Sequence, residues 1–153
     1  MCSFGSRTMR RHFQMQLLLF FVVLSCSVHG LLGIGRLQSV AVSGRLICDG
    51  RPAAGVKVKL YEKEFFLDRK MAEVYTDMNG VFLITGRKRE ISTIDPKLNV
   101  YHTCNYMGLC YKKFGITIPD DYITWGSVPD RTYDVGTLNL ANKYTGTTTD
   151  CLN

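Results

Sequence analysis

The stretch "HTCNYMGLCYKK", residues 102–113, holds the side chains with the clearest capacity for chemistry, two cysteines six positions apart. Cys104 and Cys110 could bind a metal, exchange electrons or form a disulfide. Zinc sites typically place paired cysteines two to four residues apart and need four ligands, but five residues separate these two. Redox motifs leave two residues between their cysteines and accompany a βαβ unit, which the flanking residues do not suggest. The spacing therefore favours a disulfide, if the chain is exported.

The N-terminal residues 1–30 have the three zones of a secretory signal peptide. Three arginines lie within the first eleven residues, the apolar run "MQLLLFFVVL" follows at 15–24, and small residues close the segment. The apolar run is about half the length that a membrane-spanning helix needs, roughly 20 residues. We predict cleavage after Gly30 or Ser27, a secreted product and no membrane span.

Removal of this leader leaves four cysteines, because Cys2 and Cys26 depart with it. An even number of cysteines in an exported chain indicates disulfides, and four cysteines allow three connectivities. We predict the local pair Cys104–Cys110, which leaves Cys48–Cys151 as the second disulfide.

The charge balance of the exported chain is only weakly basic. Three arginines leave with the leader, so 16 basic residues remain against 13 acidic ones. No block of like charges and no alternation of aromatic and basic residues supports nucleic-acid binding. No phosphate-binding glycine loop is present, and no residue pattern calls for a cofactor.

Short segments with alternating apolar and polar residues dominate the exported chain, and turn residues separate them. In the clearest example Val56, Val58 and Leu60 point inward while Lys57 and Lys59 point outward. The other expected strands are 38–48, 76–86, 97–104, 110–119 and 132–141. The segment "FFLDRKMAE" is ambiguous between a loop and a short helical turn, "YTGTTTD" is expected to be a loop, and Asn79-Gly80 has the residue pair of a hairpin turn.

About seven short strands at regular spacing predict an all-β fold, an antiparallel β-sandwich. We assign 1–30 to the signal peptide, 31–37 to an N-terminal segment and 38–153 to one β-sandwich domain.

The exported chain is poor in catalytic groups. His102 is its single histidine, because His12 and His29 belong to the leader. A strand histidine is more often a packing residue than a base, and no nucleophile motif or metal-ligand motif accompanies it. Asp77 and Asn79 resemble the start of a calcium loop, but the closing glutamate is missing. We predict no enzyme activity and no metal site.

Five blocks of the sequence resemble the nematode transthyretin-like family. They are "GRLICDGRPAAGVKVKLYEKE", "TDMNGVFLITG", "DPKLNVYHTC", "YITWG" and "YDVGTLNL", and with the terminal cysteine they cover nearly the whole exported chain. The resemblance implies a prealbumin-type β-sandwich, a signal peptide, two disulfides and release from the cell. Fold relatives that hydrolyse 5-hydroxyisourate use two histidines and a C-terminal Tyr-Arg-Gly-Ser, whereas this chain ends "TTTDCLN". The resemblance therefore does not carry that activity, and hormone transport is not inferred either.

Two functions remain, and both are non-enzymatic. In the first, the protein is an extracellular binding or bridging module for a protein or an anionic lipid surface. Its basic residues are Lys57 and Lys59 on an outward strand face, and Arg87, Lys88 and Arg89 in the loop expected after residue 86. In the second, it carries a small apolar ligand between its sheets or subunits. A weaker third alternative, an orphan hydrolase, requires a cleft around His102.

Overall fold

The computed structural model describes residues 14–16, 18–20 and 35–152. The chain divides into two compact units, Met1–Gly35 and Arg36–Asn153. The predicted leader and the N-terminal segment 31–37 lie mainly outside the described residues. Within the leader only residues 14–16 and 18–20 are described, and they are helical. Among the described residues no helix is both long enough and apolar enough to cross a membrane.

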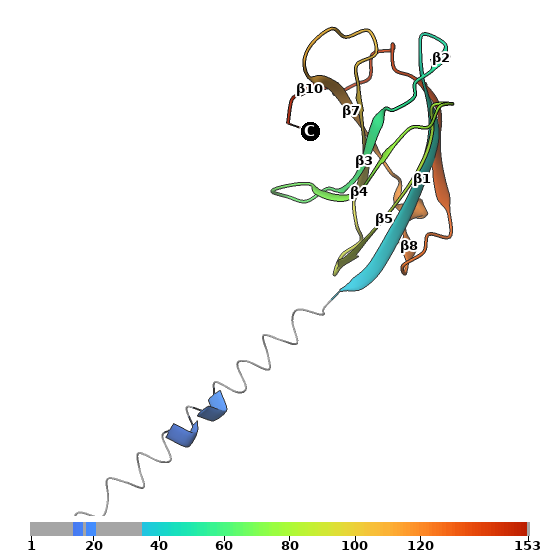
Figure 1. Cartoon of the computed structure of the whole chain (residues 1–153). Coiled ribbons are helices and arrows are strands. Elements are labelled where there is room, and N and C mark those ends of the chain that lie inside the picture. The colour runs from blue at the N-terminus through green and yellow to red at the C-terminus, as the bar shows by residue number, and fades with distance from the viewer. Residues whose placement is uncertain (1–13, 17, 21–34, 153) are drawn as a thin grey trace, which may run out of the picture. The chain divides into compact units, whose positions relative to one another are not determined.

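The second unit is a β-sandwich of two five-stranded sheets (Figure 1). Its strands are β1 (Arg36–Cys48), β2 (Arg51–Pro52), β3 (Lys57–Glu62), β4 (Arg69–Tyr75), β5 (Val81–Glu90), β6 (Pro96–His102), β7 (Tyr111–Thr117), β8 (Thr124–Trp125), β9 (Thr132–Asn139) and β10 (Thr148–Asp150), with one 3-10 turn, η1 (Asp120–Tyr122). The sequence predicted about seven strands, and the structure has ten, of which seven have six or more residues. The other three have two or three residues and are too short to show periodicity.

One sheet is built on β1, and the other is a simple antiparallel ladder. In the first sheet β1 pairs with β2, β5 and β8 antiparallel and with β9 parallel. In the second the order is β10-β7-β6-β3-β4. The prediction of an all-β sandwich is confirmed, but the β1–β9 pair departs from a wholly antiparallel arrangement. Parallel neighbours need a long crossover connection, and between β1 and β9 the chain forms four strands of the second sheet, β3, β4, β6 and β7.

The core lies between the sheets and follows the predicted alternation. Val40, Val42 and Leu46 of β1 are fully buried, as are Val58 and Leu60 of β3. They pack with residues from β5, β6 and β7, namely Phe82, Ile84, Leu98, Val100 and Phe114. Burial of an aliphatic or aromatic side chain of this size contributes about 1.5–3 kcal/mol.

Three local predictions from the sequence are wrong. The ambiguous segment "FFLDRKMAE" ends in strand β4, "YTGTTTD" contributes to strand β10, and "GRKRE" continues β5 to Glu90. Full pairing of β1 with β5, from Arg36–Glu90 to Arg45–Val81, explains the last difference, because a ten-residue partner edge extends the strand past its apolar part.

The Asn79-Gly80 turn is a corner between sheets and not a hairpin. β4 belongs to one sheet and β5 to the other. Asp77 closes the corner, since its Oδ1 accepts hydrogen bonds from the backbone N–H groups of Asn79 (2.9 Å) and Val81 (2.8 Å). Gly80 has φ +74°, and a Cβ there would overlap the carbonyl oxygen of Leu46. The turn thus requires glycine for two separate reasons.

The predicted disulfide connectivity is wrong. The structure pairs Cys48 with Cys104 and Cys110 with Cys151. The register of β6 and β7 would have placed Cys104 opposite Cys110, but the chain leaves the ladder after His102 through a turn in which Asn105 has φ +52°. That turn directs Cys104 to the end of β1 in the other sheet.

Cys110 instead meets Cys151 because β10 adds to the edge of β7. Tyr111 lies opposite Asp150 in that pair, so the next residues along the two strands are the two cysteines. One disulfide therefore joins the two sheets, and the other fixes the C-terminal strand to its neighbour.

We expect the two disulfides to contribute about equally to stability. They are separated in sequence by 56 and 41 residues. The loop-entropy relation gives about 4 kcal/mol for each, because loop length enters as a logarithm. Urea unfolding of a Cys48→Ser/Cys104→Ser variant and a Cys110→Ser/Cys151→Ser variant measures the two losses. Peptide mapping without reductant checks the pairing, and recovery of a peptide joining Cys104 to Cys110 would contradict it.

We expect Gly80→Ala to destabilise the domain more than Gly55→Ala. Gly55 also has a positive φ, +68°, but a Cβ there meets nothing within 4 Å. Gly55→Ala therefore measures the left-handed backbone cost alone, about 1–2 kcal/mol. Gly80→Ala adds the overlap with Leu46, and equal losses in urea unfolding would show that the corner relaxes without cost.

Candidate functional site

Lys57 and Lys59 point outward from the second sheet, as predicted, but other side chains cover them. Lys59 is only 8% exposed, and its Nζ lies 3.7 Å from a Glu73 carboxylate oxygen and 5.1 Å from the centre of the Tyr101 ring. Lys57 Nζ lies 5.5 Å from the centre of the Tyr111 ring. These lysines belong to an outward layer of contacts within the sheet.

This lysine–tyrosine face consists of Lys57, Lys59, Lys113, Tyr61, Tyr75, Tyr101 and Tyr111. Burial, together with the hydrogen bond to Tyr101, raises the pKa of Tyr61 to about 12. Lys113 forms an ion pair with Asp150 of β10 at 3.1 Å. Cations close to aromatic rings and carboxylates stabilise the sheet surface, so their charge is largely satisfied within the protein.

Arg87, Lys88 and Arg89 lie on β5 in the other sheet, so they do not share a face with Lys57 and Lys59. Arg87 and Arg89 are exposed, on the side of β5 opposite to the buried Phe82 and Ile84. Lys88 lies on the same side of β5 as Phe82 and Ile84, and its ammonium group pairs with both Glu64 and Glu90. Sequence reasoning placed these residues in a loop and could not assign their directions.

The β3–β4 connection carries an apolar tip that sequence reasoning missed. Phe65 and Phe66 are each 94% exposed and Leu67 is 75% exposed. The two phenyl rings pack edge to face with centroids 4.8 Å apart. Figure 1 shows this connection as a loop that projects away from the sandwich. Two adjacent phenylalanines between two alternating segments were the available signal, because core residues rarely occur as neighbours in a turn.

Ion pairs attach the base of this tip to the C-terminal end of β5. Glu64 accepts a hydrogen bond from Arg69 Nε at 3.2 Å and also contacts Lys88. The hydrogen bond from Lys88, with a second from Arg69, lowers the pKa of the Glu64 carboxyl group. Lys63 pairs with Asp95 at 3.5 Å. The tip and the basic strand end thus form one continuous surface.

We call this surface the hairpin end and define it as residues 63–69 and 87–90. It holds five cations against three carboxylates, so its net charge is positive around an apolar tip. Arg36, at the adjacent start of β1, lies over the Trp125 ring with its Cζ 4.3 Å from the centroid. Trp125 is 48% exposed, whereas Tyr122 packs against Tyr133 with ring centroids 4.9 Å apart. Arginine and exposed aromatic side chains therefore continue beside the hairpin end.

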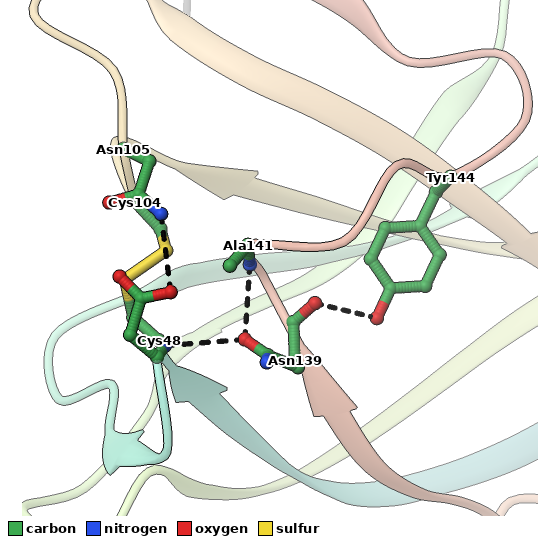
Figure 2. Close-up of a disulfide and its surroundings, with 7 residues drawn as sticks. Cys48, Cys104, Asn105, Asn139, Ala141 and Tyr144 are labelled. Atoms are coloured by element: carbon green, nitrogen blue, oxygen red, sulfur yellow. Dashed lines mark hydrogen bonds between the residues drawn. A yellow bond between two sulfur atoms is a disulfide. The ribbon is translucent and has the colours of Figure 1, made fainter.

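The opposite end of the sandwich contains His102 and the Cys48–Cys104 disulfide. The register of β3 and β6 sets Lys57 opposite Tyr101 and Glu62 opposite Pro96, so His102 lies far from the β3–β4 tip. Asn139 organises this end, because its side-chain oxygen accepts a hydrogen bond from the N–H group of Asp49 (3.3 Å). It accepts another from the N–H group of Ala141 (3.1 Å), which Figure 2 shows. The sulfur atoms of Cys48 and Cys104 lie near the Asp49 carboxylate, but both are bonded in the disulfide and offer no thiolate to a metal.

His102 is 4% exposed, and its ring packs edge-on to Phe114 with centroids 5.9 Å apart. Burial, with a smaller effect of the nearby Lys112 ammonium group, lowers the pKa of the imidazole. Cavities do adjoin His102, as the hydrolase alternative required. However, its Nδ1 has no hydrogen-bond partner in the described part of the chain, so no carboxylate accepts from this nitrogen as in a histidine-based triad.

A model of the family described as "TTR-52: Transthyretin-like family" matches residues 43–119. Three similar relatives come from Caenorhabditis elegans. Transthyretin-like protein 5 is 47% identical over 78% of this chain and 88% of its own length. Transthyretin-like protein 2 is 44% identical over 86% and 95%, and transthyretin-like protein 33 is 40% identical over 75% and 82%.

Among solved structures, a 9R-lipoxygenase from Cyanothece PCC8801 superposes with a TM-score of 0.41 and 19% identity, over 67% of this chain and 16% of that one. A likeness this weak says nothing about activity. The family match and the identities over most of the domain agree with the five sequence blocks and the two-sheet fold. The chain belongs to the transthyretin-like family.

Proposed function

We propose that this protein is a secreted, non-enzymatic binding or bridging module that docks on anionic lipid surfaces through its hairpin end. The exposed Phe65–Phe66 pair carries the proposal. Two neighbouring phenylalanines that are each 94% exposed are unusual in a domain that buries the phenylalanines of its strands, Phe82 and Phe114. Each would gain about 1.5–3 kcal/mol on leaving water.

The position of the cations favours a lipid surface over an apolar protein groove. Five cations and three carboxylates surround the tip, and Arg87 has no ion-pair partner among the described residues. Aromatic side chains insert at the boundary between headgroups and acyl chains, while nearby lysines and arginines attract anionic headgroups. Both contributions act together only if they occupy one end of the molecule, as they do here.

Secretion is supported by the leader-like residues 1–30 and by the two disulfides, which persist in oxidising compartments. A non-enzymatic role is supported by the fact that no carboxylate of the described residues forms a hydrogen bond with His102 Nδ1. A bridging role needs a second surface, and we assign it to the lysine–tyrosine face of the second sheet, which shares no residue with the hairpin end.

We expect Phe65→Ser/Phe66→Ser to lower the affinity for phosphatidylcholine vesicles that contain phosphatidylglycerol by more than about tenfold, because both apolar contributions are lost. Co-sedimentation with the vesicles measures the affinity. Secreted protein is compared with a Met107→Ser/Leu109→Ser variant. That control removes two equally exposed apolar side chains from the opposite end. Equal weakening by both pairs would indicate nonspecific adhesion and contradict the proposal.

We also expect Arg87→Glu/Arg89→Glu to weaken binding, and added salt to reduce the wild-type affinity because exposed charges are screened above about 0.15 M. Lys112→Glu/Lys143→Glu makes the same charge change away from the hairpin end and should leave vesicle binding unaffected. Absence of binding to anionic vesicles, or binding indifferent to Arg87→Glu/Arg89→Glu, would overturn the lipid proposal and favour a protein partner.

A further inference from the structure

Two cavities adjoin His102 at the end of the sandwich opposite the hairpin end, each of about 350 Å³. Leu140 also lines both, so this residue and His102 separate them. The first cavity extends along residues 140–147, and the second extends toward Cys48 and Cys104. Their volumes lie at the lower end of the range of small-molecule sites, roughly 300–1,000 Å³.

His102 is buried, and one of its ring nitrogens, Nδ1, has no partner among the described residues. The side chain is 4% exposed. A buried polar atom without a partner costs about 1–3 kcal/mol. The His102 ring lines both cavities, so a molecule bound there would contact it.

Two lysines give the first cavity a positive wall. Lys112 and Lys143 both line it, and the Lys112 ammonium group acts electrostatically on His102. Lys112 Nζ lies 5.5 Å from the centre of the Tyr106 ring, and neither lysine forms an ion pair with a described carboxylate. This is where the site differs from the lysine–tyrosine face, on which Lys59 and Lys113 are neutralised by Glu73 and Asp150.

Contacts around Tyr144 hold another part of the cavity lining in place. Tyr144 stacks on Phe114 with ring centroids 4.1 Å apart, and its hydroxyl donates to the Asn139 carbonyl oxygen at 3.0 Å (Figure 2). Thr147 Oγ1 donates to the Tyr144 carbonyl oxygen at 2.7 Å and closes the turn. The Cys48–Cys104 disulfide fixes the second cavity from the other side. A preformed wall spares a ligand the cost of ordering it.

We propose that the cavity between His102 and Tyr144 is a binding site for a small organic anion with an apolar body. The acid group pairs with Lys112 and Lys143, the imidazole forms a hydrogen bond, and Leu140 and Tyr144 contact the apolar part. The site is independent of the hairpin end and requires neither lipid nor a second subunit.

The test uses two fluorescent probes with one scaffold, 8-anilinonaphthalene-1-sulfonate and its uncharged analogue N-phenyl-1-naphthylamine, titrated into secreted protein. We expect saturable binding of the sulfonate at one site. Lys112→Glu/Lys143→Glu should lower the affinity for the sulfonate by at least about tenfold and the affinity for the uncharged probe much less, because only the sulfonate loses a charge-assisted contact. His102→Phe should weaken the sulfonate while leaving the domain at least as stable in urea.

Two variants separate this site from the hairpin end. Arg87→Glu/Arg89→Glu makes the same charge change as the lysine pair, and Phe65→Ser/Phe66→Ser removes the exposed aromatic tip; both should keep sulfonate affinity within about twofold of wild type. NMR of wild-type protein gives a direct readout, since the His102 imidazole signals, identified by their loss in His102→Phe, should shift on sulfonate addition. Unshifted imidazole signals, or sulfonate binding abolished only by Phe65→Ser/Phe66→Ser, would overturn the proposal.

Discussion

The arrangement of this domain depends on the backbone hydrogen bonds of one strand, β1. Each of the other four strands of its sheet pairs with β1, and its thirteen residues run from Arg36, opposite Glu90, to Cys48. Gln38 extends this role beyond the ladder, because its buried side chain accepts from Ile94 N–H at 3.0 Å and donates to the Ser92 carbonyl at 2.7 Å. A strand that spans the whole sandwich fixes the separation between the hairpin end and the end that holds the Cys48–Cys104 disulfide.

Residues whose burial follows a short-range rule were predictable from the sequence. Val58 and Leu60 alternate with Lys57 and Lys59, so strand type and inward face followed directly, and the repeated pattern gave the sandwich. Family resemblance then supplied the fold in detail. The departures occur where long-range pairing decides: β5 continues through a basic segment because β1 offers it an edge, and Cys104 turns away from Cys110 because Asn105 adopts a left-handed conformation.

The candidate sites were harder to predict for the same reason. Lys59 is outward by periodicity, yet it is buried, with its Nζ beside Tyr101 of β6 and Glu73 of β4, which are distant in sequence. Phenylalanine is usually a core residue, so the residue type alone does not predict that Phe65 and Phe66 are exposed. They are exposed because they lie in the connection between β3 and β4. His102 was assigned to a strand correctly, but the cavities beside it arise from the 140–147 segment, whose path over the core no local pattern encodes.

The two outer strands of the second sheet also bear on how the protein avoids self-association. An open strand edge presents unpaired backbone groups that can template another chain. β4 carries Arg69, Lys70 and Glu73 along its edge, and such charges discourage pairing with a neighbour. On the other side of the sheet, β10 covers the edge of β7 at Tyr111–Lys113, and the Cys110–Cys151 disulfide joins the two strands. The second disulfide therefore fastens the strand that covers this edge, and its reduction would leave only the β10–β7 backbone pairing and the Lys113–Asp150 ion pair to keep the edge closed.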